Sequence, residues 1–323
     1  MAIDLAIVFG GALLMLAISE VVIRLTLRLA RHYRLSGSFV GLTILSVGTS
    51  LLEIMTHIVG SVRIVQQPEQ MNTLSGLLLG SNIGSDVFQQ NFVLPLVALL
   101  GTVVVVRRML VLEVGALIAA SCLLWFACLG GVITRLAGAL LVLAYAAYLY
   151  ILGRTRRTET PPLRERLARH KALVFVGLVI LCFVGMALVA DPVLGAATRL
   201  VAQLPMSASL FGIVVLGVCT AMPELMTALV SIYKGQREIS AGILIGSNIT
   251  NPLLSAGLGA MISGYTVPNA IVAYDLPAKI LTGALIYLFL WRRQDLSRSE
   301  AFVLIALYFA YVAGRGVLFT ADF

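Results

Sequence analysis

The sequence predicts an all-α membrane protein with about ten transmembrane helices, arranged as two inverted repeats of five helices. Three observations support this prediction. The chain of 323 residues is 60% hydrophobic and only 12% charged, so it has too few charged residues to cover a soluble protein of this length. Several apolar segments are longer than the roughly 20 residues that span a bilayer. Two blocks of sequence also occur twice, in the same order.

Hydropathy and helix-breaking residues together predict ten spans. Their approximate limits are 3–27, 38–65, 72–99, 110–130, 132–152, 172–200, 208–233, 239–262, 276–292 and 300–319. The four cysteines fall in these apolar segments without metal-ligand spacing. The chain also carries no GxSxG motif or His/Cys metal cluster. The sequence therefore predicts neither a bound cofactor nor an enzyme.

The distribution of basic residues predicts the orientation of the chain. Five basic residues fall on the face that holds both termini: Arg63, Arg135, Arg199, Lys279 and Arg315. The opposite face holds Arg24, Arg28, Arg31, Arg34, Arg107, Arg108, Arg154, Arg156, Arg157, Arg164, Arg166, Arg169, Lys171, Lys234, Arg237, Arg292, Arg293 and Arg298. Positive residues mark the cytoplasmic side, so both termini are expected outside a cell (inner) membrane. Topology thus explains the net charge of +8 without a nucleic-acid partner, and binding of anionic lipids is the alternative.

The one sizeable hydrophilic segment is the basic stretch 153–171. Pro161, Pro162 and its dense charge indicate a cytoplasmic linker. We therefore expect a first repeat over 1–152, with its motif at 41–95. A second repeat is expected over 172–323, with its motif at 212–262.

The internal duplication is explicit in the sequence. GLTILSVGTSLLEIMT (41–56) aligns without a gap to GIVVLGVCTAMPELMT (212–227), and SGLLLGSNI (75–83) aligns to AGILIGSNI (241–249). Five spans separate the copies, and an odd number of crossings turns the second copy upside down. Inverted repeats of this kind occur in secondary transporters, whose substrate site lies near the midplane between interrupted helices. We expect interruptions at 48–50 and 219–223, and also at 80–82 and 246–248.

Glu53 and Glu224 occupy equivalent positions of the first block, inside apolar spans. A charged side chain at the bilayer centre costs about 2.5–3.5 kcal/mol on insertion scales, so each needs a partner. Nearly all basic residues fall at helix ends, which makes a bound cation the simplest partner. Hard cations such as Ca²⁺ bind carboxylate, hydroxyl and carbonyl oxygens, and the neighbouring donors are Thr49, Ser50, Thr220, Ser81 and Ser247. Two carboxylates neutralise one divalent ion or two monovalent ions.

Each of these features also has a simpler interpretation. A single glutamate in a span can be a protonated packing contact. Thr49, Ser50 and Thr220 can bond to carbonyls of their own helices. Each Gly-Ser-Asn can be a turn or a close helix contact. The pairing of all these features in both halves favours the ion site.

The two blocks resemble the α-repeats of the cation/calcium antiporter superfamily, which contains the sodium/calcium exchangers. The usual repeat reads G-T-S-x-P-E/D, followed by G-S-N with Asn or Asp four residues after the serine. The resemblance covers most of the chain and implies electrogenic exchange of Ca²⁺ for Na⁺ by alternating access. It implies that spans one and six slide against a core that holds the ions.

The resemblance also implies roles for individual residues. Glu53 and Glu224 become the principal ligands. Thr49, Ser50 and Thr220 become ligands through hydroxyl or backbone oxygens, Ser81 and Ser247 contribute hydroxyls, and Asn251 takes the amide position of the second repeat.

The chain departs from the family pattern at several positions. Leu52 replaces the proline, Cys219 a glycine and Ala221 a serine, which removes one hydroxyl ligand. In the first repeat Ser85 takes the position of Asn251, with Asp86 one step beyond. Asp86, about 100° further round the helix, is either a third carboxylate ligand or part of the cytosolic approach.

Three further titratable residues need an interpretation. His57 lies one helical turn after Glu53. It either tunes Glu53 and relays protons or is capped by a neighbouring hydroxyl. Glu113 and Asp275 begin spans four and nine, and we expect them to be interfacial anchors paired with Arg107, Arg108 or Lys279.

The sequence therefore predicts an antiporter that exchanges Ca²⁺ for Na⁺ in a lipid bilayer, without an obligate protein partner. The alternative is a H⁺-coupled exchanger of divalent cations such as Ca²⁺, Mn²⁺ or Mg²⁺, because ligand loss and His57 favour protons. A cation channel with a carboxylate filter is a more distant alternative.

Overall fold

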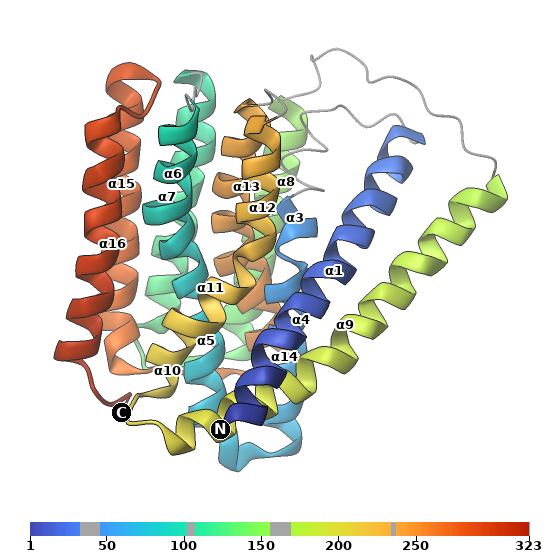
Figure 1. Cartoon of the computed structure of the whole chain (residues 1–323), viewed down its shortest axis with the longest axis vertical. Coiled ribbons are helices and arrows are strands. Elements are labelled where there is room, and N and C mark those ends of the chain that lie inside the picture. Colours follow the sequence, from blue (N-terminus) through green and yellow to red (C-terminus); the bar gives the residue numbers. More distant parts are fainter. Residues whose placement is uncertain (33–45, 102–106, 156–168, 234–236, 323) are drawn as a thin grey trace.

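The computed structural model describes residues 1–32, 46–101, 107–155, 169–233 and 237–322. Almost all of this part of the chain is helical, as expected where lipid cannot satisfy backbone hydrogen bonds. The helices form ten stretches that run between the two ends of one bundle (Figure 1). Eight of these stretches are long and apolar enough to span a membrane by length and composition. The all-α, ten-span prediction is confirmed.

The first five stretches come from residues 2–155. They are α1 (Ala2–His32); α3 (Ser46–Thr49) with α4 (Leu51–Gln66); a 3₁₀ turn (Pro68–Gln70), α5 (Met71–Phe88), a π-helical turn (Gln89–Val93) and α6 (Leu94–Leu100); α7 (Arg107–Cys128); and α8 (Arg135–Thr155).

The second five stretches come from residues 169–318. They are α9 (Arg169–Gln203); α10 (Ala208–Phe211), a π-helical turn (Gly212–Leu216), α11 (Gly217–Thr220) and α12 (Met222–Tyr233); α13 (Arg237–Thr250), a π-helical turn (Asn251–Ser255) and α14 (Ala256–Ser263); a π-helical turn (Ile271–Asp275) with α15 (Leu276–Arg293); and α16 (Arg298–Leu318).

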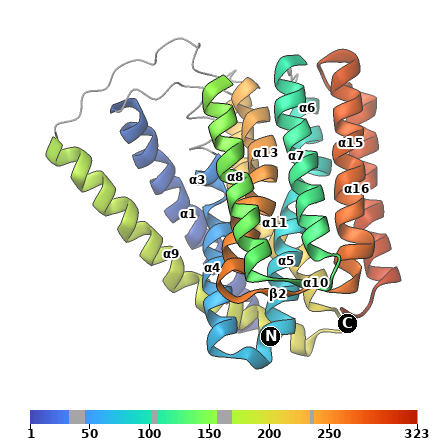
Figure 2. The ribbon, with the colours of Figure 1, turned by 180° about the vertical axis from the view of Figure 1, so that it is seen from behind.

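The two halves have opposite orientations. In Figure 1, α4 descends toward the end that holds both termini, whereas α12 climbs away from that end. Two-residue strands β1 (Val132–Ile133) and β2 (Tyr265–Thr266) pair antiparallel and connect the halves at the same end (Figure 2). The upside-down duplication expected from the sequence is therefore present in the fold.

The helix interruptions at 48–50 and 219–223 occur as expected. Ser50 separates α3 from α4 with φ −79° and ψ 7°, and Ala221 separates α11 from α12 with φ −80° and ψ −2°. A ψ near zero lies outside the helical range. Ser50 and Ala221 are equivalent in the repeat alignment, three residues before Glu53 and Glu224. The duplication has therefore preserved both the sequence and the local backbone conformation.

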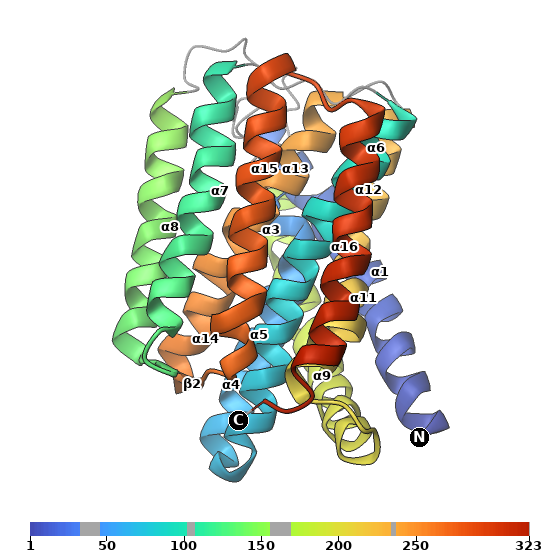
Figure 3. The same ribbon diagram turned by 90° about the vertical axis from the view of Figure 1, so that its left-hand side faces the viewer.

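The predicted interruptions at 80–82 and 246–248 are wrong, because α5 and α13 continue through them. The Gly-Ser-Asn glycine of the first repeat, Gly80, instead permits a close helix crossing. A Cβ on Gly80 would lie 2.3 Å from the carbonyl oxygen of Ser209, and one on Gly84 would lie 2.5 Å from the Cα of Ile213. This crossing brings α5 against α10, α11 and the π-helical turn between them, at the centre of the bundle (Figure 3).

Helices α1 and α9 form a separate oblique pair beside the other eight stretches (Figures 1 and 2). They pack against each other along their length, and α9 also contacts α4. Ser19 of α1 donates a hydrogen bond to the carbonyl of Gly48, next to the first break (3.0 Å). The pair therefore reaches the interrupted helix directly.

Candidate functional site

Glu53 lies in the first turn of α4 and is almost completely buried. Ser85 of α5 donates a hydrogen bond to its Oε1 over 2.8 Å. Its Oε2 is buried and has no hydrogen-bond donor among the residues that the structure describes. Glu53 also interacts electrostatically with Glu224, so the fold brings the two repeated carboxyl groups near each other.

Glu224 lies in the first turn of α12 and is fully buried. Ser50, at the break of the other repeat, donates to its Oε1 over 3.4 Å. As in Glu53, the Oε2 atom is buried, and no residue in the described part of the chain donates to it. The two glutamates thus share one pattern, in which a serine hydroxyl holds one oxygen and the second oxygen is left for another partner.

Thr49 and Thr220 bond to their own helices in the same way. Thr49 donates to the carbonyl of Ser46 and Thr220 to that of Gly217, both over 3.2 Å. These carbonyls are equivalent in the repeat alignment. The back-bonded interpretation is therefore the observed one for both hydroxyl protons, while the hydroxyl oxygens remain acceptors beside the breaks.

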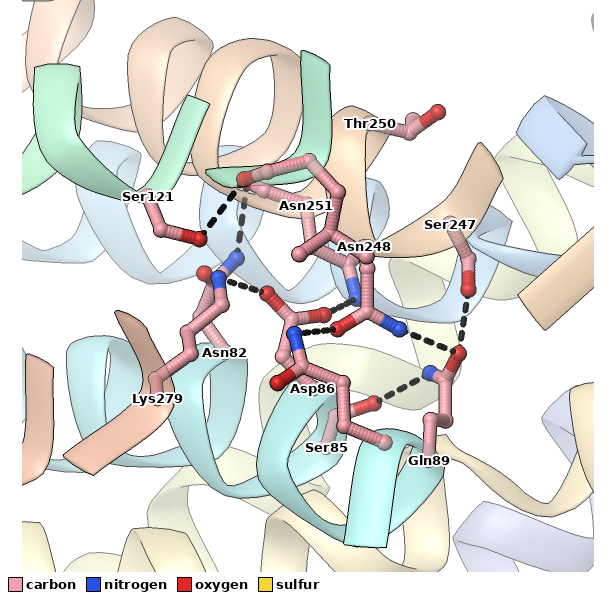
Figure 4. A network of polar contacts seen from close by, with 12 residues as sticks. Asn82, Ser85, Asp86, Gln89, Ser121, Ser247, Asn248, Thr250, Asn251 and Lys279 are labelled. Carbon is pink, nitrogen blue, oxygen red and sulfur yellow. Dashed lines mark hydrogen bonds and ion pairs between the residues drawn. The ribbon is translucent and has the colours of Figure 1, made fainter. Parts of the chain in front are cut away.

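The remaining predicted serines lie on the α5 and α13 side of the site. Ser81 is buried in α5. Ser247 of α13 donates to Oε1 of Gln89, whose Nε2 donates to Ser85 over 3.1 Å (Figure 4). Asn248 also donates to Gln89, over 3.2 Å. A chain of hydrogen bonds therefore runs from Ser247 through Gln89 and Ser85 to Glu53.

Asp86 faces away from this chain. It is fully buried, and its carboxylate forms an ion pair with Lys279 of α15 and accepts a hydrogen bond from Asn251 Nδ2 (2.8 Å) (Figure 4). The structure therefore places Asp86 in the bundle interior, against a lysine and an amide from the second half of the chain. Asn251, expected as an ion ligand, donates a hydrogen bond from its amide nitrogen to Asp86. Its Oδ1 is buried and accepts no hydrogen bond from the described residues.

The structure also corrects two predicted pairings. Lys279 is not an interfacial partner of Asp275, because its side chain is fully buried against Asp86. Asp275 instead pairs with Arg315 of α16 over 3.1 Å and accepts from Tyr311 over 2.9 Å. Glu113 is buried, and the side chains of its predicted partners Arg107 and Arg108 lie outside the described residues.

His57 is fully buried, and its Nδ1 lies 2.9 Å from the hydroxyl of Tyr265. The same hydroxyl lies 2.7 Å from Ser61 Oγ. This is the hydroxyl-capped arrangement that competed with proton relay, and it leads toward β2 rather than toward Glu53.

Sequence reasoning missed Lys279, Gln89, Gln90 and Asn248 as members of the polar interior. Gln90 donates to Asn248 Oδ1 over 2.8 Å and so connects the two repeats. A signal was present, since three consecutive amides (89–91) and a lysine inside apolar spans are costly there. Their partners could not be read from the sequence.

The arrangement can bind a cation between the repeats. Carboxylate oxygens buried without donors are strongly disfavoured unless a cation or proton compensates them. Across the described residues, no three His, Cys, Asp or Glu side chains form a group that could hold a metal ion. A cation bound to the two glutamates would therefore complete its shell with hydroxyl, amide and carbonyl oxygens, as hard cations do.

Comparison with known proteins finds a family model that matches nearly the whole chain. The family model described as sodium/calcium exchanger protein matches residues 3–154 and 174–317. Inner membrane protein YrbG of Escherichia coli is 28% identical over 305 residues, covering 90% of this chain and 89% of that protein. Sodium/calcium exchanger MaX1 of Methanosarcina acetivorans is 28% identical over 104 residues, covering 32% of this chain and 30% of its own.

Solved structures of the sodium-calcium exchanger NCX_Mj share the fold. One, soaked with Na⁺ and Sr²⁺, superposes with a TM-score of 0.66 at 21% identity, covering 97% of this chain and 99% of the other. The match of the family model to nearly the whole chain agrees with this fold and with the repeated motifs. The chain therefore belongs to the sodium/calcium exchanger protein family, whose members are multi-pass membrane antiporters rather than enzymes.

Proposed function

We propose that this protein exchanges Ca²⁺ for Na⁺ by alternating access and that Glu53 and Glu224 are the carboxylate ligands of the transported ion. One observation carries the proposal. The two glutamates are buried beside equivalent helix breaks, and each keeps one oxygen to which none of the described residues donates a hydrogen bond. Desolvated carboxylate oxygens of this kind are ready-made ligands for a dehydrated cation.

Charge balance supports exchange rather than one-way binding. The two carboxylates neutralise one Ca²⁺ or two Na⁺ ions, so either load removes the cost of buried negative charge. The oxygens of Ser50, Ser81, Ser85, Thr49 and Thr220 supply candidate neutral ligands on both sides of the glutamates, with Ser247 and Asn251 further along the same network. The names of MaX1 and NCX_Mj give the same pair of ions for those relatives.

Alternating access requires a part that moves relative to the ion site. The oblique α1–α9 pair is the candidate for this part, because its two helices pack against each other beside the other helices and contact the interrupted helix beside Gly48. In inverted-repeat transporters, movement of one bundle against another opens the site to each side in turn.

The proposed setting is a cell inner membrane, as in the printed name of YrbG. The basic segment 153–171 is proposed to be cytoplasmic and both termini outside, according to the positive-inside rule. The two repeats are proposed to span 1–152 and 172–323.

The test is Ca²⁺ uptake into proteoliposomes loaded with Na⁺. Glu53→Gln and Glu224→Gln should each abolish Na⁺-driven uptake while the purified proteins remain monodisperse. Glu69→Gln is the matched control, because Glu69 is exposed near the end of α4. Uptake that persists in both site variants would overturn the ligand assignment.

Proton coupling is the second candidate, and the limited number of neutral ligands favours it. Ala221 lacks the hydroxyl that Ser50 offers at the equivalent break of the first repeat. Uptake that continues without a Na⁺ gradient and collapses with the pH gradient would identify this mode. Ca²⁺ flux without any countertransported ion would identify a channel.

A further inference from the structure

The pair of Asp86 and Lys279 is a buried charge pair that the proposed exchange does not use. Both side chains are fully inaccessible to solvent, and they come from α5 and α15, 193 residues apart. Asn251 Nδ2 completes the surroundings of the carboxylate over 2.8 Å (Figure 4). Ion pairs taken this far from water are costly to bury and are weak evidence for stability alone. Their retention within a membrane interior indicates function.

The pair lies directly beside the proposed ion site. Ser85, the residue before Asp86, donates to Glu53 over 2.8 Å. Asp86 interacts electrostatically with both Glu53 and Glu224. Its charge therefore belongs to the same electrostatic unit as the two glutamates.

The charge of this unit follows from its members. Glu53, Glu224 and Asp86 contribute three negative charges, and the Lys279 ammonium contributes one positive charge. The net charge of minus two is balanced by one Ca²⁺ or by two Na⁺ ions. Without the ammonium, the same three carboxylates would require one more monovalent cation.

We propose that the Lys279 ammonium acts as a resident counter-cation that occupies the place beside Asp86 otherwise open to a transported monovalent ion. Lys279 thereby sets the number of cations carried in each cycle. It also explains why Asp86 is a carboxylate in the interior yet not an ion ligand. This inference rests on the proposed function, since it concerns the same ion site.

A purely structural role for the pair makes a different prediction. If the pair only held α5 against α15, removal of either partner would lower the stability of the protein without changing the number of bound ions. A counter-cation changes the ion count, and each variant alters it in a known direction. The net charge of the four residues becomes minus three in Lys279→Met and minus one in Asp86→Asn. In the double variant it is minus two again.

The experiment measures Na⁺ dependence in the purified full chain and in proteoliposomes. The first readout is the rise in unfolding temperature with Na⁺ concentration, which reports ion binding directly. The second is the steepness with which Na⁺ drives Ca²⁺ uptake. Lys171→Met is the matched control, because Lys171 is exposed at the start of α9.

In Lys279→Met, the number of bound Na⁺ ions inferred from the Na⁺ dependence should rise by about one in both readouts. The double variant should keep the steepness of the unmodified protein. Asp86→Asn should weaken Ca²⁺ binding by about tenfold or more, because it leaves the ammonium unpaired beside the site. Equal steepness in Lys279→Met and the unmodified protein would overturn the proposal.

If Lys279→Met does not fold, Asp86→Asn and the double variant test the proposal. Unchanged Ca²⁺ binding in Asp86→Asn, or altered steepness in the double variant, would also overturn the proposal. Absence of Ca²⁺ uptake by the unmodified protein would instead reject the proposed function. The Na⁺-dependent unfolding temperature would still test the role of Lys279 in that case.

Discussion

Ser50 and Glu224 lie 174 residues apart in the chain, and Ser50 Oγ donates a hydrogen bond to Glu224 Oε1 over 3.4 Å. A hydroxyl at the break of one repeat therefore holds the carboxylate of the other. The equivalent contact, from the break of the second repeat to Glu53, cannot form. Ala221 occupies the position equivalent to Ser50 and has no hydroxyl. Glu53 takes its hydrogen bond from Ser85 instead, over 2.8 Å. The two halves of the site are symmetric in backbone and asymmetric in ligands.

This asymmetry gives a first prediction. Ser50→Ala removes a candidate hydroxyl ligand of the ion as well as the donor to Glu224, and we expect a loss of about 1 kcal/mol, or roughly fivefold weaker Ca²⁺ binding. Ala221→Ser supplies the missing hydroxyl to the other break and should strengthen binding. Titration of the purified protein with Ca²⁺ measures both effects. Thr198→Ala is the control, since Thr198 bonds only to its own helix at Leu194. Equal affinities of Ser50→Ala and the control would contradict the prediction.

A second prediction concerns the helix crossing at Gly80. A Cβ there would lie 2.3 Å from the Ser209 carbonyl oxygen, so the clash is with backbone rather than with a flexible side chain. Gly80→Ala should therefore destabilise the protein by about 1–3 kcal/mol through overpacking. Gly115→Ala is the matched control, because, outside its own stretch of helix, no atom of the described residues lies within 4 Å of its added Cβ. Thermal unfolding in detergent should show a lower midpoint for Gly80→Ala alone.

The third prediction separates a structural role of His57 from proton relay. Tyr265→Phe removes the hydroxyl that lies within hydrogen-bond distance of His57 and Ser61. Buried groups left without partners should cost about 1–3 kcal/mol of stability. Transport and its pH profile should stay unchanged, because this cluster does not contact the proposed ligands. Tyr150→Phe is the control for loss of a tyrosine hydroxyl, because Tyr150 is exposed. A shifted pH profile in Tyr265→Phe would support the relay.

The fourth prediction concerns the Asp275–Arg315 pair, which is fully buried. Asp275→Asn leaves the guanidinium without its nearest carboxylate, and breaking such a pair costs about 3–5 kcal/mol. We expect the lower end of this range, because Asp322 lies 3.8 Å from the same guanidinium. Glu20→Gln breaks the solvent-exposed pair with Arg24 (2.7 Å) and should change the unfolding temperature little. Similar effects of the two substitutions would show that burial does not matter here.

Much of the fold was predictable because its signals are local or repeated. Apolar length marks the spans, and the aligned blocks reveal the inverted duplication and the breaks at Ser50 and Ala221. The Gly-Ser-Asn segments were predicted wrongly because glycine and serine favour both turns and close helix contacts. Only the position of Ser209 against Gly80 distinguishes these two roles.

By itself, the sequence determined that the chain spans a bilayer repeatedly, that its halves are inverted copies, and that Glu53 and Glu224 are equivalent. These features follow from the composition of the chain, the length of its apolar segments and the repetition of its sequence blocks. The tertiary structure alone decided what each buried charge meets. Asp86 meets Lys279 from a helix 193 residues away, and Asp275 meets Arg315 rather than Lys279. The physical reason is that contacts between distant helices depend on how those helices cross, and no local pattern records a crossing.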